Sequence, residues 1–349
     1  MAVNSLKFDI AESLMTSSVP MCFKCPTLIT LLCQTEYLAS ISLVLPYNAL
    51  WISLFIQKMK REQNRNTLGN RLKRLEALST SRYLMPGAPV YARLDGRSFH
   101  TFCRGLEKPY SMQFISAMQE ATKRIVDDFG CLLGYAQSDE ISICWKDISK
   151  APFEGRIQKL ESVLASSASA YFNYEIFGTE KYPELRRRAE KCIPVFDCRV
   201  FNVPSMEELA NAFLWRENDA IKNSINGMSL SFFSQKELDK KNCDEKVHMM
   251  RMKGYCFHED TMESFMRGSF FQRKLVKKEI SKSEIMKIPE KNRPEMDSDG
   301  KFYVMRSEIG KMNIPYRLTD IENKVGVLFN GEEAILNKTN PTFRLENFS

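Results

Sequence analysis

Two aspartates, Asp95 and Asp139, stand where apolar segments of the chain give way to polar turns. Asp95 ends the apolar segment PVYARLD and is followed by Gly96, and Asp139 closes a polar stretch between the segments CLLGYA and EISICW. Carboxylate oxygens are the ligands that Mg²⁺ prefers, and converging carboxylates beside a glycine turn suit two-metal phosphoryl transfer. Taken separately, the Asp-Gly-Arg segment is more typical of a plain β-turn and the Ser-Asp-Glu segment of a solvated hairpin loop. Their combination favours a phosphoryl-transfer site more than either segment does, but the pattern alone leaves a metal site and a pair of turns as open alternatives.

The turn that follows Asp95 offers further groups that suit a phosphate. A glycine lets the backbone approach an ion closely, and successive amides in a turn can face anionic oxygens. The amides in question are those of Gly96, Arg97, Ser98 and Phe99. The side chains of Arg93 and Arg97 are candidates for added positive charge. Glu140 follows Asp139 directly, so on a strand its side chain points to the opposite face, which makes it a poorer direct ligand.

The elements around the two aspartates predict how they meet. Hydrophobic periodicity indicates, in order, a strand, a helix, two strands, a helix and a strand. These elements are expected at residues 89–95, 111–130, 131–136, 140–145, 156–177 and 193–203. This order predicts an α+β fold, an α/β sandwich with a ferredoxin-like βαββαβ core, extended by further helices and C-terminal strands. In its usual strand order, 4-1-3-2, the first and third strands are antiparallel neighbours, so Asp95 and Asp139 converge. Beyond the core we expect a helix from Met206 towards Met228, a short strand near Gly254–Phe257 and another strand at residues 269–280.

The first part of the chain differs in composition from the rest. Between residues 25 and 57 the only charged side chain is Glu36, but Pro46 and Asn48 interrupt the apolar run, and the pieces are shorter than the ~20 residues of a membrane span. We expect residues 1–58 to form a poorly ordered extension with no stable membrane association. A helix is expected after this, because Leu68, Leu72 and Leu75 recur at helical spacing.

We expect a catalytic domain over residues 59–280 and a C-terminal region of unknown role over 281–349.

Charge and cysteine content bear on the partner and the compartment of the protein. The formal charge of +7 suits a polyanionic partner without requiring one. The ten cysteines are scattered, so we expect free thiols in a reducing compartment and no zinc site. A cytoplasmic location is predicted, with a mitochondrial one as the alternative.

Four ordered segments resemble motifs of the tRNA(His) guanylyltransferase superfamily. They are RLDGRSFHTF at 93–102, YAQSDEIS at 135–142, FDCRVFNVPS at 196–205 and WRENDAIKNSI at 215–225. The resemblance extends over roughly residues 66–276, and four motifs in order are much more specific than any one of them.

The resemblance implies a nucleotidyltransferase with a polymerase-like palm that adds nucleotides to the 5′ end of tRNA, in the 3′–5′ direction. It implies that ATP or GTP activates a 5′-monophosphate, and that other nucleoside triphosphates are then added. Two Mg²⁺ ions would be held by Asp95, the Gly96 carbonyl and Asp139, which are the implied catalytic residues. The implied nucleotide-binding residues are Asp95, Gly96, Arg97, Ser98, Phe99, His100, Lys108, Ser138, Asp139 and Asn223. A homotetramer is also implied.

The sequence departs from the tRNA(His)-specific enzymes at two places. The stretch Ile221–Ser224 reads IKNS, where those enzymes carry a His-Ile-Asn-Asn type segment, and Ser111 replaces an acidic residue. Both departures resemble the guanylyltransferase-like branch, whose members repair truncated tRNA 5′ ends by templated addition. The alternatives are guanylate addition to tRNA(His), a non-catalytic tRNA-binding protein, and a palm-type nucleotidyl cyclase. A cyclase function would not explain the motif at 215–225 or the basic segment that contains Arg267 and Arg273.

Overall fold

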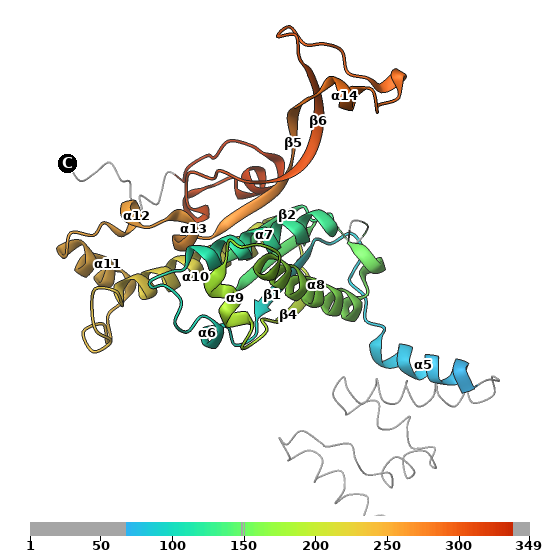
Figure 1. Ribbon diagram of the computed structural model, residues 1–349. Helices are drawn as coiled ribbons and strands as arrows, with labels where there is room; N and C mark the ends of the chain where they lie inside the picture. The colour runs from blue at the N-terminus through green and yellow to red at the C-terminus, as the bar shows by residue number, and fades with distance from the viewer. Residues whose placement is uncertain (1–67, 148, 150, 338–349) are drawn as a thin grey trace, which may run out of the picture. The chain divides into compact units, whose positions relative to one another are not determined.

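The computed structural model describes residues 68–147, 149 and 151–337, which belong to two compact units (Figure 1). The described part of the first unit is helix α5 (Leu68–Thr80), which buries none of its residues. The helix predicted from the leucine spacing is therefore confirmed, whereas the expected extension over residues 1–58 lies outside the described residues. Among the helices described, none has the length and apolar character required to cross a bilayer.

The second unit is built on a six-stranded antiparallel sheet with the order β4-β1-β3-β2-β5-β6. The strands are β1 (Val90–Gly96), β2 (Leu133–Gln137), β3 (Glu140–Trp145), β4 (Phe196–Asn202), β5 (Ser269–Ile280) and β6 (Phe302–Lys311). The first four strands have the 4-1-3-2 order of a ferredoxin-like core, so the predicted α+β fold is confirmed.

Two long helices, α7 (Met112–Asp128) and α8 (Ile157–Gly178), pack against one face of this core. Helix α7 begins at Ser111, whose hydroxyl accepts the Phe114 amide at 3.4 Å and so satisfies one free donor of the first turn. The apolar side of α7, with Phe114, Met118 and Ile125, is buried in one cluster with Ala92 and Leu94 of β1. The short 3₁₀ helix η1 (Pro152–Gly155) precedes α8, and helix α9 (Pro183–Ala189) follows it.

The opposite face of the sheet is covered in part by α10 (Met206–Ser229), which the side chain of Ser205 caps. Tyr91 of β1 meets Phe213 of α10 with ring centres 5.3 Å apart. C-terminal segments complete this second core, including η3 (Leu318–Asp320) and the π-helical turn η4 (Gly326–Asn330).

The segment between α10 and the last strands is helical. It contains α11 (Cys243–Met252), α12 (Phe257–Asp260) and α13 (Glu263–Met266). A short strand expected near Gly254–Phe257 was a wrong prediction: Gly254 has φ +83° just after α11, and the Cys256 amide donates to Asp260 Oδ2 at 2.7 Å, which starts α12. A run of four residues with a bulky apolar pattern does not distinguish a strand from a capped turn of helix.

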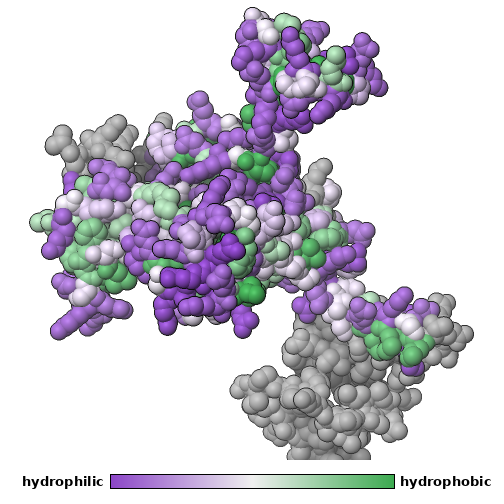
Figure 2. All heavy atoms as spheres, viewed as in Figure 1, coloured by the Kyte–Doolittle hydropathy of each residue, from purple (hydrophilic) through white to green (hydrophobic). Residues whose placement is uncertain are grey.

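The strand expected at residues 269–280 is confirmed as β5, and β6 pairs with it over its whole length. The chain between the two strands contains α14 (Lys282–Ile285) and η2 (Glu290–Asn292). In Figure 2 the surface of this outer hairpin is mostly hydrophilic. The domain limits expected at residues 58 and 280 stay predictions.

Candidate active site

The two aspartates converge at one edge of the sheet, as predicted. In the β1–β3 register Asp95 lies opposite Glu140, the residue that follows Asp139. The Gly96 amide donates to the Asp139 carbonyl oxygen at 3.0 Å, which ties the end of β1 to the β2–β3 turn. Two carboxylates more than forty residues apart in sequence are thereby placed side by side.

Burial and the neighbouring charge of Asp95 both disfavour the ionised form of Asp139. Burial raises the pKa of Asp139, and the neighbouring charge of Asp95 adds to the rise, while the Ser138 hydroxyl, which donates to Asp139 Oδ1 at 3.0 Å, opposes it. Within residues 68–147, 149 and 151–337 neither aspartate forms an ion pair with Lys, Arg or His. Two neighbouring carboxylates without a cation suit a divalent metal ion.

The same part of the chain holds no group of three or more His, Cys, Asp or Glu side chains placed to hold a metal. A Mg²⁺ ion bound by one or two carboxylates completes its octahedron with water and substrate phosphate oxygens. The donor set of Asp95, Asp139 and the Gly96 carbonyl therefore fits magnesium bound together with a nucleotide.

Both turns at this edge adopt uncommon backbone conformations. Ser98 has φ 57° and Ser138 has φ 47°, in the left-handed region that non-glycine residues seldom occupy. Strain of this kind persists where the surrounding structure enforces it, and it is frequent at functional sites. The two serines belong to the predicted nucleotide contacts, so backbone strain marks the same turns that the motifs do.

Close packing explains why residue 96 is glycine. A Cβ atom on Gly96 would lie 2.4 Å from the Phe99 ring, which is far closer than atoms can approach. Phe99 is itself fixed in the core, with its ring centre 5.0 Å from that of Phe196 and 5.6 Å from that of Phe172. The turn is thus folded down onto a buried aromatic cluster, and its position does not depend on a ligand.

Arg188 of α9 also supports this turn, and sequence reasoning missed it. Its Nε and Nη2 donate to the carbonyls of Phe102 at 2.8 Å and Thr101 at 2.7 Å, at the end of α6 (Phe99–Phe102). Three consecutive arginines, residues 186–188, were the available signal, but nothing in their spacing distinguishes the one that faces the site.

Glu140 pairs with two arginines and lies opposite Asp95 in the β1–β3 register. Arg216 of α10 donates from Nε to Glu140 Oε1 at 2.7 Å, and Arg93 Nε lies 3.8 Å from Oε2. Burial raises the pKa of Glu140, and Arg216 opposes that rise most strongly. Directly opposite residues share a face of the sheet, so Glu140 lies on the face that carries Asp95. That Glu140 is not a direct ligand stays a prediction. Arg216 is a second supporting residue that was not predicted.

The remaining predicted contacts lie at different distances from the pair. His100 and Arg97 are exposed on the turn, and the His100 ring is close enough to lower the pKa of Asp139 slightly. Burial raises the pKa of the Cys103 thiol to about 12, Asp139 adds to the rise, and Lys108 opposes it, so Lys108 and Asp139 both lie near that thiol.

Asn223 reaches the site only through a chain of side chains. Its Nδ2 donates to Asp219 Oδ2 at 3.3 Å, and the same oxygen accepts from Arg216, the partner of Glu140, at 2.9 Å. A role of Asn223 in nucleotide binding stays a prediction, as do the roles of the other site residues.

Arg267 does not belong to the basic surface with which the sequence grouped it. It is buried, with Nη2 2.7 Å from Glu217 Oε1, and it donates to the carbonyls of Ile314 at 2.9 Å and Tyr316 at 2.7 Å. The Leu318 amide satisfies the second oxygen of Glu217 at 2.7 Å. Part of the WRENDAIKN motif therefore holds the C-terminal segment in place.

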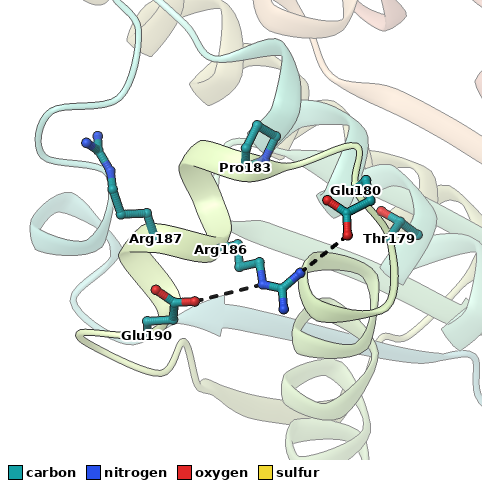
Figure 3. Close-up of a pocket in the computed structure, with 6 residues that line it drawn as sticks. All are labelled: Thr179, Glu180, Pro183, Arg186, Arg187 and Glu190. Atoms are coloured by element: carbon teal, nitrogen blue, oxygen red, sulfur yellow. Dashed lines mark ion pairs between the residues drawn. The ribbon is translucent and has the colours of Figure 1, made fainter.

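Two cavities lie among the described residues, and neither has room for a nucleotide beside the aspartates. One of about 170 Å³ lies at α9 and is lined by Thr179, Glu180, Pro183, Arg186, Arg187 and Glu190. In Figure 3 Arg186 lies between Glu180 and Glu190, 3.9 and 3.8 Å from their carboxylates, and Arg187 points away. These are exposed ion pairs, worth at most about 1 kcal/mol each. A cavity of about 10 Å³ beside Ser138 has room for about one water molecule.

Comparison with known proteins places this geometry in a family. The sequence profile of the family described as tRNAHis guanylyltransferase matches residues 69–204, which include both aspartates and the first four strands. A bacterial tRNA(His) guanylyltransferase-like protein solved in complex with ATP superposes with a TM-score of 0.53 at 34% identity, over 60% of this chain and 87% of that one. The chain belongs to the tRNA(His) guanylyltransferase superfamily, a family of nucleotidyltransferases. The predicted resemblance is thereby confirmed at the level of the superfamily.

More distant superfamily relatives match a similar region. An uncharacterized protein of Acanthamoeba polyphaga mimivirus is 27% identical over 52% of this chain and 69% of its own length. The tRNA(His) guanylyltransferase of Debaryomyces hansenii is 29% identical over 45% of this chain, which spans 58% of that enzyme. The profile match ends before α10, so the helix that carries Asn223 lies outside the profile.

Proposed function

We propose that this protein adds nucleotides to the 5′ end of tRNA in the 3′–5′ direction, by phosphoryl transfer that depends on two Mg²⁺ ions. The observation that carries the proposal is the unneutralised carboxylate pair, Asp95 and Asp139, inside the region that matches the family. The ATP complex of the bacterial relative supports a nucleotide as one substrate.

Different residues bind the metal ions and the triphosphate. Asp95, the Gly96 carbonyl and Asp139 hold magnesium, which when bound neutralises phosphate charge and favours ionisation of the attacking hydroxyl. The turn that contains Ser98 and His100 contacts the triphosphate. Two amides of this turn, those of Gly96 and Arg97, already donate within the protein, to Asp139 and Val195. Anion binding by the backbone is therefore assigned to the amides of Ser98 and Phe99.

The reaction has two balanced transfers. A 5′-monophosphate oxygen of the tRNA first bonds to the α-phosphorus of ATP, or of GTP, and pyrophosphate leaves. The 3′-hydroxyl oxygen of the incoming nucleotide then bonds to the activated 5′-phosphorus, the nucleoside monophosphate leaves, and the hydroxyl loses its proton. Each step exchanges one P–O bond for another, so positioning and charge stabilisation are what the protein must supply.

Within the superfamily we assign the chain to the branch that repairs truncated 5′ ends. The supporting observations are Ser111, which serves here as the cap of α7, and the IKNS stretch of α10. Lys222 and Asn223 are exposed, whereas the Ser224 hydroxyl is buried and donates to carbonyls within the fold, including that of Met266 at 2.9 Å.

The experiment offers the protein two 5′-monophosphorylated tRNAs with magnesium and all four nucleoside triphosphates. One is full-length tRNA(His), and the other is a different tRNA that lacks its first nucleotide. Products are identified by 5′-end sequencing, with the Asp139→Asn variant as the control for contaminating activity. Addition of the template-matched nucleotide to the truncated tRNA is expected. Guanylate addition to tRNA(His) alone would overturn the branch assignment, and no addition to either substrate would overturn the enzymatic proposal in favour of tRNA binding.

A further inference from the structure

One face of the palm sheet combines charge and aromatic surface beside the aspartates and is only partly covered. In the β1–β4 register, residues directly opposite one another point to the same face, with Cβ atoms about 5 Å apart. The opposite pairs on this face are Asp95 with Asp197, Arg93 with Arg199, and Tyr91 with Phe201. The other face carries Ala92, Leu94 and Val200 into the core under α7 and α8.

Helix α10 lies over β1 and β3 on this face, where its Phe213 meets Tyr91 and its Arg216 binds Glu140, the residue opposite Asp95. The β4 row of this face, at the edge of the sheet, stays open to solvent. Phe201 is 42% exposed, and the side chains of Asp197 and Arg199 are each 55% exposed.

Trp215 of α10 adds a second exposed aromatic ring to the same face. It is 54% exposed, and the guanidinium of Arg93 lies 5.4 Å and that of Arg216 4.6 Å from its ring centre. Neighbouring cations of this kind hold an aromatic ring in a fixed orientation. A large ring that is oriented but open to solvent is a ready stacking platform.

The spacing of these groups along the strands suits a strand of stacked nucleotides. Successive residues on one face are about 7 Å apart, so the arginines lie about 7 Å and Phe201 about 14 Å from the carboxylates. Stacked nucleotides repeat at about 3.4 Å, so these lengths correspond to about two and four nucleotides. Single-stranded RNA is bound by such combinations of arginine and exposed aromatic residues on an open sheet.

We propose that Trp215 and Phe201, with Arg93 and Arg199 between them and the aspartates, bind the 5′-terminal nucleotides of the acceptor RNA. The bases stack on the two rings and the phosphates face the arginines. The inference rests on the proposed function for the identity of the RNA, and it adds the surface that receives the RNA end.

The test measures binding without catalysis. Full-length protein is titrated, in EDTA and without nucleotides, into a 5′-monophosphorylated tRNA that lacks its first nucleotide and carries a fluorophore at its 3′ end. Trp215→Ala and Phe201→Ala are each expected to weaken binding about tenfold, and Trp215→Phe is expected to restore most of it. Arg199→Ala should lower the slope of log affinity against log salt by about one.

The matched control is Tyr174→Ala. Tyr174 is 60% exposed and has the Arg124 guanidinium 4.6 Å from its ring centre, but it lies on α8, which packs on the other face of the sheet. Unchanged affinity is expected for this variant. Wild-type affinity in both Trp215→Ala and Phe201→Ala, or an equal loss in Tyr174→Ala, would overturn the inference. If binding depends on Trp215 and Phe201 as expected but the magnesium-dependent assay above shows no nucleotide addition, the proposed function fails and the binding surface stands.

Discussion

Two groups of charges in this protein, one buried and one half-buried, differ in how they are satisfied. In the first, Glu217 and Arg267 pair at 2.7 Å, and backbone groups of the C-terminal segment bond to both of them. In the second, Asp95 and Asp139 lie side by side with no cation of the protein paired to either among the described residues, and burial raises the pKa of Asp139. The first group is complete without a ligand, whereas the proposed function assigns magnesium to the second.

This difference separates structural from functional charges within one set of motifs. Arg216 and Glu217 are consecutive in the WRENDAIKN motif, yet Arg216 supports Glu140 beside the active site and Glu217 holds the C-terminal segment. Motif membership alone does not assign a role. A better criterion for the role of a buried charge is whether groups of the protein already satisfy its hydrogen-bonding capacity.

The largest effect is expected from breaking the complete pair. Arg267→Ala should lower the free energy of unfolding by about 3–5 kcal/mol, because it leaves the Glu217 carboxylate buried and unpaired. Urea denaturation followed by circular dichroism measures this. The matched control is Arg273→Ala, whose ion pair with Asp127 at 2.6 Å is exposed and should contribute no more than about 1 kcal/mol. Similar losses in the two variants would contradict the assignment of Arg267 as a structural residue.

A smaller effect is expected from filling the turn beside the aspartates. Gly96→Ala should cost about 1–3 kcal/mol, because its Cβ atom would lie 2.4 Å from the buried Phe99 ring. Gly178→Ala is the control, since its added Cβ atom would meet Tyr174 at an ordinary 3.7 Å. Thermal unfolding of both variants separates the two cases. Equal melting temperatures would show that the turn relaxes and is not fixed by Phe99.

The smallest effect has the opposite sign. Asp139→Asn should raise the stability of the metal-free protein at neutral pH by at most about 1 kcal/mol, since it removes a charge that burial and Asp95 disfavour. Because the folded-state pKa is raised, the contribution of Asp139 to stability is present below its unfolded pKa and is lost as the pH rises through the folded pKa. The advantage of Asn should therefore disappear as the pH falls towards 3.8, the ordinary Asp value.

Melting temperatures in EDTA across this pH range test the expectation. Magnesium should then raise the melting temperature of the wild-type protein more than that of the variant. A variant that is less stable than wild type at neutral pH would mean that Asp139 has a structural partner.

The sequence was sufficient to predict the palm and the meeting of its aspartates. The strands around Asp95 and Asp139 are short apolar runs bounded by turns, and one topological rule then brings their ends together. The roles of Arg188, Arg216 and Arg267 were not predictable, because each depends on partners 50 or more residues away that no local pattern indicates. The tail after Ile280 was not assigned either, since β6 is defined by its pairing with β5 and has no distinct pattern of its own.

The most direct test of the account is single-turnover nucleotide addition by the Asp139→Asn variant, with tRNA affinity measured in parallel. We expect at least about a 100-fold loss of the addition rate, with tRNA affinity unchanged within about threefold. Addition at the wild-type rate would contradict the assignment of Asp139 to the catalytic pair.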